Sequence, residues 1–95
     1  MSMIADILLS QLKDALRELE LHDDVLKLER WSSQLKSNSQ LEREAAAQHI
    51  VDRCHVRWWG DLNLQVPGEG DYPVYTFLDQ VRAAVIAEVD GGSGL

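Results

Sequence analysis

The chain is short and acidic, with 95 residues, a formal net charge of −7, 45% hydrophobic residues and 26% charged residues. These values predict one small folded domain and exclude wholesale disorder. They also disfavour direct binding to nucleic acid or to an anionic membrane surface. Arg53 and Arg57 are the nearest approach to a basic cluster, and residues 61–95 hold one arginine against six acidic residues.

No stretch of the sequence reaches the roughly 18–20 consecutive apolar residues that a membrane-spanning helix needs. The apolar run from Met3 to Leu9 is interrupted by Asp6, has no basic leader and continues into a helical pattern, unlike a signal peptide. We therefore expect a cytoplasmic protein that does not bind membranes.

The first predicted element is an amphipathic helix over residues 4–21, uninterrupted by proline or glycine. Its apolar residues recur at steps of three and four, the spacing of one helix face. They are Ile4, Ile7, Leu8, Leu12, Ala15, Leu16 and Leu19. Leu9 and Leu21 fall outside this face, so the apolar surface is wide enough to contact two neighbours, as in a bundle or a dimer.

A break is predicted over residues 22–24, where Asp23 and Asp24 suit the N-terminal end of a helix that starts at Val25. In this second helix, Leu28, Trp31 and Leu35 recur at steps of three and four, which predicts that Trp31 belongs to the core. The polar residues 37–39 end the helix.

A third helix is predicted from Ser39, because residues 39–42 match the S-x-x-E capping box. Apolar residues continue at helical spacing as far as Trp58, so we expect the helix to reach Trp59. Gly60 would then follow its end, in the left-handed conformation that glycine adopts without a steric penalty. The alternative is a short β-hairpin that turns at Gly60 and Asp61, because Leu62, Leu64 and Val66 alternate.

Residues 67–73 contain two prolines and two glycines and are predicted to form a loop. Pro73 suits the first turn of a fourth helix. The apolar stripe of that helix is Phe77, Leu78, Val81, Ala84, Val85 and Val89. The sequence thus predicts a mainly α, compact three- to four-helix domain over residues 1–90, with a flexible tail over residues 91–95.

The residues that could carry chemistry are few. His49, Asp52, Cys54 and His55 are the only cluster of metal-ligand types, but His49 and His55 do not share a helix face, so no metal site is predicted. Neighbours such as Cys54 and His55 rarely bring sulfur and imidazole within hydrogen-bond distance. We therefore expect no catalytic residue and no cofactor, and we interpret Cys54 as a buried thiol.

The most informative stretch contains the adjacent tryptophans Trp58 and Trp59, which follow Arg57. Neighbouring side chains point in different directions on a helix or on a strand, so one ring can fill the core while the other needs a second partner. Tryptophan, tyrosine and arginine dominate binding hot spots. We therefore predict a partner-binding surface, and its candidate residues are Arg57, Trp58, Trp59, Tyr72 and Tyr75.

The functional hypothesis is a non-catalytic protein-interaction module that acts as an adaptor, a chaperone-like factor or an inhibitor of a regulatory protein. It would bind another protein and form a homodimer through its apolar helix faces. One alternative is an acidic mimic of nucleic acid that blocks a basic groove with its C-terminal carboxylates. The other is a small ligand-binding protein or enzyme that uses Cys54 and His55.

Overall fold

The computed structural model describes residues 3–55, 58–62, 64–66 and 73–93. Its elements are α1 (Met3–Glu18), α2 (His22–Gln34), α3 (Gln40–Arg53), the 3₁₀ turn η1 (Trp59–Asp61) and α4 (Pro73–Ser93). The described residues contain no strand, so the prediction of a mainly helical domain is confirmed. In the same part of the chain, none of the helices combines the length and apolar character needed to cross a membrane.

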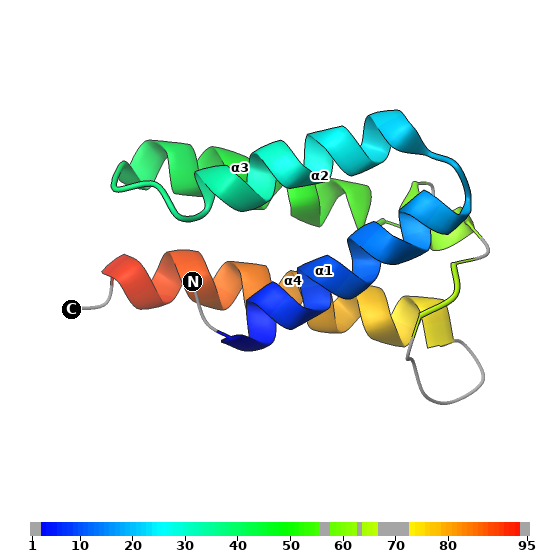
Figure 1. Ribbon diagram of the computed structural model, residues 1–95. Helices are drawn as coiled ribbons and strands as arrows, with labels where there is room; N and C mark the ends of the chain where they lie inside the picture. The colour runs from blue at the N-terminus through cyan, green and yellow to red at the C-terminus, as the bar shows by residue number, and fades with distance from the viewer. Residues whose placement is uncertain (1–2, 56–57, 63, 67–72, 94–95) are drawn as a thin grey trace.

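The four helices form a bundle in which each helix packs against the next and α4 returns to α1. In Figure 1, α2 and α3 make the upper layer, and α1 and α4 lie beneath them. Short connections favour such antiparallel neighbours. The turn η1 also packs against α4, which places this early part of the α3–α4 connection beside the bundle.

One hydrophobic core runs through the bundle. Every helix and the turn η1 contribute to it, and its largest fully buried side chains are Trp59, Phe77, Leu12, Leu16, Leu28, Ile50, Leu78, Val81 and Val85. Trp31 is buried as predicted. The stripe predicted for the fourth helix also faces the core, because Phe77, Val81 and Val85 are fully buried.

The break between the first two helices lies earlier than the sequence pattern indicates. α1 ends at Glu18, and Glu20 adopts the left-handed conformation with φ of 60°. The N–H of Glu20 donates to Arg17 and that of Leu21 donates to Leu16, which together form a Schellman motif. The prediction that α2 starts at Val25 is wrong, because His22 already begins it and the two aspartates lie in its first turn.

The predicted start of the third helix is correct. Ser39 is its N-cap, and the Ser39 hydroxyl accepts a hydrogen bond from the Glu42 N–H. The second half of the capping box is replaced, because the Ser39 N–H donates to the Ser37 hydroxyl instead. The fourth helix begins at Pro73 as predicted and continues to Ser93, so it includes the first three residues of the predicted tail.

The predicted end of the third helix is wrong. α3 ends at Arg53 and does not reach Trp59, and the hairpin alternative is wrong too, because Gly60 and Asp61 lie in the 3₁₀ turn. Helical spacing from Cys54 would have put Trp58 on the buried stripe. The observed turn puts Trp59 into the core instead, so tertiary burial of that ring overrides the local pattern.

Candidate partner-binding site

The two adjacent tryptophans have opposite environments. Trp59 is buried with 2% of its surface exposed, whereas Trp58 has 52% of its surface exposed. The two rings therefore occupy different environments, as the sequence predicts, but they do so in a turn and not in a helix. The structure also identifies the exposed ring, which the sequence could not do.

A short hydrogen-bonded turn fixes both rings. The carbonyl oxygen of His55 accepts from the N–H of Trp58 at 3.0 Å and from the N–H of Gly60 at 3.1 Å. A Cβ atom at Gly60 would lie 3.0 Å from that carbonyl oxygen, so the close approach favours glycine, which has no Cβ. The backbone therefore holds Trp58 outward while it buries Trp59.

Arg53, at the end of α3, covers the exposed ring. Its guanidinium carbon lies 4.4 Å from the centroid of the Trp58 ring, which is a cation–π contact. Within the described part of the chain, no carboxylate forms an ion pair with Arg53. The arginine thus restrains the tryptophan and keeps a positive charge that no described acidic side chain neutralises.

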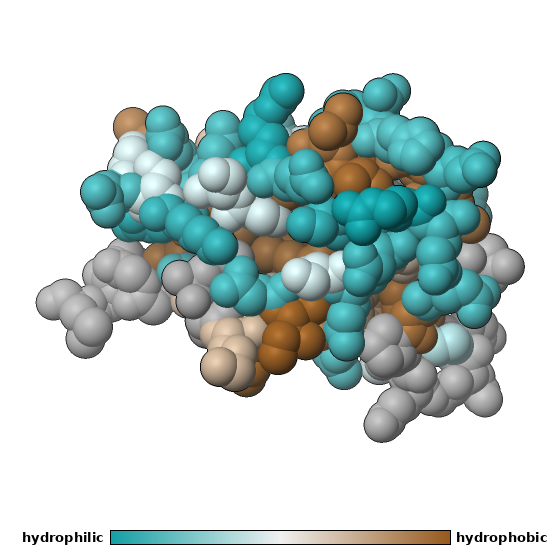
Figure 2. Space-filling view, viewed as in Figure 1, coloured by the Kyte–Doolittle hydropathy of each residue, from teal (hydrophilic) through white to brown (hydrophobic). Residues whose placement is uncertain are grey.

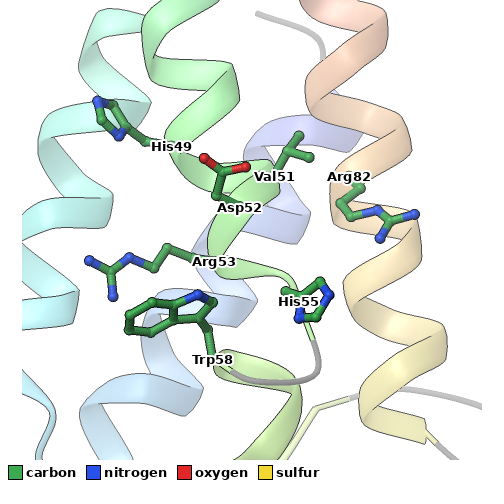
Figure 3. A pocket seen from close by; sticks show the side chains of 7 residues that line it. All are labelled: His49, Val51, Asp52, Arg53, His55, Trp58 and Arg82. Atoms are coloured by element: carbon green, nitrogen blue, oxygen red, sulfur yellow. The ribbon is translucent and has the colours of Figure 1, made fainter.

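Trp58 and Arg53 line an open groove of about 600 Å³ between the end of α3 and α4. The lining residues are His49, Val51, Asp52, Arg53, His55, Trp58 and Arg82. Figure 3 shows Asp52 and Arg53 on α3, the Trp58 ring beside the Arg53 side chain, and Arg82 on α4. The groove therefore combines one large aromatic surface with cationic side chains from two helices.

The positive character of this groove contrasts with the whole chain. Its lining has two arginines and one acidic residue, whereas the whole chain has 9 lysines and arginines against 16 acidic residues. The one lining carboxylate, Asp52, accepts a hydrogen bond from the Gln48 amide at 2.8 Å. Arg82 has a solvent-exposed partner, Asp79, at 3.8 Å, and such surface pairs are weak.

The wall of the groove formed by His49 is supported from the core. The His49 ring stacks on Trp31, with 5.1 Å between ring centroids and 11° between ring planes. Since Trp31 is buried in α2, this stack ties the groove to the interior of the bundle. This side of the groove is therefore supported by the packing of α3 against α2.

Of the other predicted partner-binding residues, Tyr75 lies close to the groove. It is 42% exposed and lines a neighbouring depression with Cys54, His55, Asp79 and Arg82. The two depressions share His55 and Arg82. Arg57 and Tyr72 lie outside the described residues.

Cys54 behaves as a core residue. It is 5% exposed, and burial raises the pKa of its thiol to about 12, with a smaller opposing effect from Arg82. The thiolate is the reactive form of cysteine, so this environment suppresses nucleophilic chemistry at neutral pH. Among the residues that the structure describes, no group of three or more histidine, cysteine, aspartate or glutamate side chains could hold a metal ion.

Sequence reasoning missed most of the groove. His49, Asp52 and Arg53 are spaced by three and four residues along α3, so their common face could have been found from helical spacing. Arg82 comes from α4, and no local pattern connects it to α3. It stands out only as the single basic residue of the acidic C-terminal part.

Comparisons with known proteins return no family for this chain. No protein-family model matches it, and no curated protein or solved structure resembles it significantly.

Proposed function

We propose that this chain is a small non-catalytic protein-interaction module whose partner-binding surface is centred on Trp58. The observation that supports the proposal is the half-exposed Trp58 ring, covered on one side by Arg53 and placed at the edge of an open groove. Tryptophan and arginine are the residue types most enriched among binding hot spots. A surface of this kind suits an adaptor, a chaperone-like factor or an inhibitor.

The contacts around Trp58 favour binding because they limit the freedom that the free protein would lose. The Arg53 guanidinium lies against the ring, and the backbone of the turn is fixed by the His55 carbonyl. A side chain that is already ordered loses less entropy when a partner covers it. The proposed surface is therefore ready for contact without a rearrangement of the bundle.

Self-association is the second part of the proposal, and we place it at a different surface. Met3, Ile4 and Ile7 are 77%, 68% and 49% exposed. In Figure 2, apolar atoms gather at the lower edge of the molecule, where α1 begins. Asp6 in the same turn forms an ion pair with Lys36 at 3.6 Å. An apolar patch with its nearby charge paired can meet the same patch of a second copy without like-charge repulsion, as a two-fold interface requires, whereas two copies of the cationic groove would repel each other.

The experiment is capture of partners from the native host lysate by the tagged full-length chain at low and at high salt, read by mass spectrometry. Three baits are compared: the unmodified chain, Trp58→Ala, and Leu41→Ala as a control that removes another exposed apolar side chain, 78% exposed on α3. We expect one stoichiometric protein to remain at high salt with the unmodified chain and with Leu41→Ala, and to be lost with Trp58→Ala. A protein that is held equally by all three baits would contradict the proposed surface.

The same capture experiment also distinguishes the proposed module from an acidic mimic of nucleic acid. Release of every partner at high salt, with equal capture by all three baits at low salt, would favour an acidic mimic of nucleic acid, because salt screens exposed charges and such a mimic does not need Trp58. The self-association is tested separately, by measuring the molar mass of the purified chain and of Ile4→Asp with light scattering. We expect a dimer for the first and a monomer for the second, and a monomer for both would contradict the dimer.

A further inference from the structure

We propose that the Trp58 groove recognises an acidic segment of the protein partner, with carboxylates bound by Arg53 and Arg82 and an apolar side chain packed on Trp58. The inference rests on the proposed function and adds the chemistry of the partner. It depends on the charge of the groove, which is opposite in sign to that of the chain around it.

The two arginines supply the charge complementarity. Each guanidinium offers five N–H donors in a planar fork that matches a carboxylate. Arg53 has no ion-pair partner among the described residues, and the Asp79 carboxylate near Arg82 is at the long distance of 3.8 Å with 70% of its side-chain surface exposed. A partner carboxylate can therefore bind Arg53 without displacing an ion pair between described residues and can replace the weak contact at Arg82.

The aromatic ring adds an apolar contact to these polar ones. Trp58 is held by Arg53 on one side, and 52% of its surface is open to solvent. A guanidinium that contacts an aromatic face can still donate hydrogen bonds from its edge. One acidic residue and one apolar residue close together in the partner would therefore satisfy Arg53 and Trp58 at the same time.

The remaining charges favour a peptide over a nucleic acid. Asp52 lines the groove, and the chain as a whole has a net charge of −7. A long phosphate backbone would approach many of these carboxylates, whereas a short acidic segment contacts the groove alone. The occupant is thus an acidic stretch of protein in contact with α3 and α4.

The test is selection of short random peptides from a displayed library on the immobilised full-length chain. We expect the selected peptides to be enriched in aspartate and glutamate next to an apolar residue. The affinities of a selected acidic peptide are then measured for the unmodified chain, for Arg53→Gln/Arg82→Gln and for Arg30→Gln, an exposed arginine on α2 that does not line the groove. Loss of two charged hydrogen-bonding groups should weaken binding at least about tenfold, whereas Arg30→Gln should leave it unchanged.

The outcomes distinguish this inference from the proposed function. Peptides that require Trp58 but lack acidic residues, or that bind Arg53→Gln/Arg82→Gln normally, overturn the inference and leave Trp58 as the partner-binding residue. Recovery of no acidic peptide also overturns it, while capture from the lysate decides the proposed function independently. Circular dichroism of each variant confirms that the helices remain folded, so a loss of affinity reports the groove itself.

Discussion

Trp58 and Trp59 are neighbours in the chain and chemically identical, yet one is 52% exposed and the other 2% exposed. Trp59 packs into the core with the residues of α4, and Trp58 lies beneath the Arg53 guanidinium at the edge of a groove. Residue type alone therefore does not decide whether a tryptophan stabilises the core or is available to bind a partner. The backbone of the turn decides it, because the turn orients the two side chains in different directions.

The largest expected effect comes from removal of the buried ring. Trp59→Ala should lower the free energy of unfolding by about 3–5 kcal/mol, because it leaves a cavity in the core. Trp58→Ala should lower it much less, by about 1 kcal/mol, since that ring is half exposed and leaves no cavity in the core. Urea denaturation followed by circular dichroism measures both values, and equal losses would contradict the division between the two rings.

Gly60→Ala tests the turn that separates the rings. The new Cβ would lie 3.0 Å from the His55 carbonyl oxygen and 3.3 Å from Cε1 of Tyr75, so the backbone has to shift. Overpacking of this kind costs about 1–3 kcal/mol of stability. We also expect the shift to change the exposure of Trp58, measured as acrylamide quenching of fluorescence. Unchanged stability together with unchanged quenching would show that the turn does not need glycine.

Cys54 belongs to the same core as Trp59, and its protonation tests how closed that core is. Burial raises the pKa of the folded-state thiol from the ordinary value of 9.0 to about 12. Above pH 9 the unfolded chain therefore loses this proton while the folded chain keeps it, so stability is lost as pH rises through the window from 9 to 12. Below pH 9 both states hold the proton, and this residue adds no pH dependence.

The expected loss between pH 8 and pH 10 is about 1.4 kcal/mol more for the unmodified chain than for Cys54→Ala. Urea denaturation of both proteins at the two pH values measures it. Comparison with Cys54→Ala removes the contributions of the other titrating groups. The same pH dependence in both proteins would show that the folded thiol titrates near its ordinary range.

The smallest effect is expected at Arg53. Arg53→Gln removes the cation–π contact with Trp58 and should cost about 0.5–1 kcal/mol of stability. It should also make Trp58 more accessible to acrylamide. Arg30→Gln is the control, since it removes an exposed arginine that does not contact this ring. If acrylamide quenches the tryptophan fluorescence of both variants to the same extent, Arg53 does not restrain Trp58.

The parts of the fold that the sequence predicts are those with a strong local signal. The stripe of Phe77, Val81 and Val85 and the cap at Ser39 required only helical spacing and hydrogen-bonding chemistry. The end of α1 could not be predicted in the same way, because Glu20 occupies a left-handed position where glycine is usual. The end of α3 was predicted wrongly, because the burial of Trp59 depends on α4 and not on its neighbours in the chain.

The residues of the candidate site also differ in whether a local signal in the sequence predicts them. Trp58 and Tyr75 were predicted from residue type and composition, and the structure places them in neighbouring depressions. Arg53 joins them because α3 ends there, and Arg82 joins them because α4 packs against α3. Such long-range neighbours have no signature in a single sequence, so the charge of the groove became visible only in three dimensions.

The role of Trp58 as a binding anchor is best tested by the amount of partner that Trp58→Ala captures from the host lysate at high salt, relative to Leu41→Ala. If Trp58 is the anchor of the partner-binding surface, Trp58→Ala loses the stoichiometric partner and keeps its folded stability, while Leu41→Ala retains both. Undiminished capture by Trp58→Ala would show that the exposed ring contributes nothing to binding and that the partner-binding surface lies elsewhere.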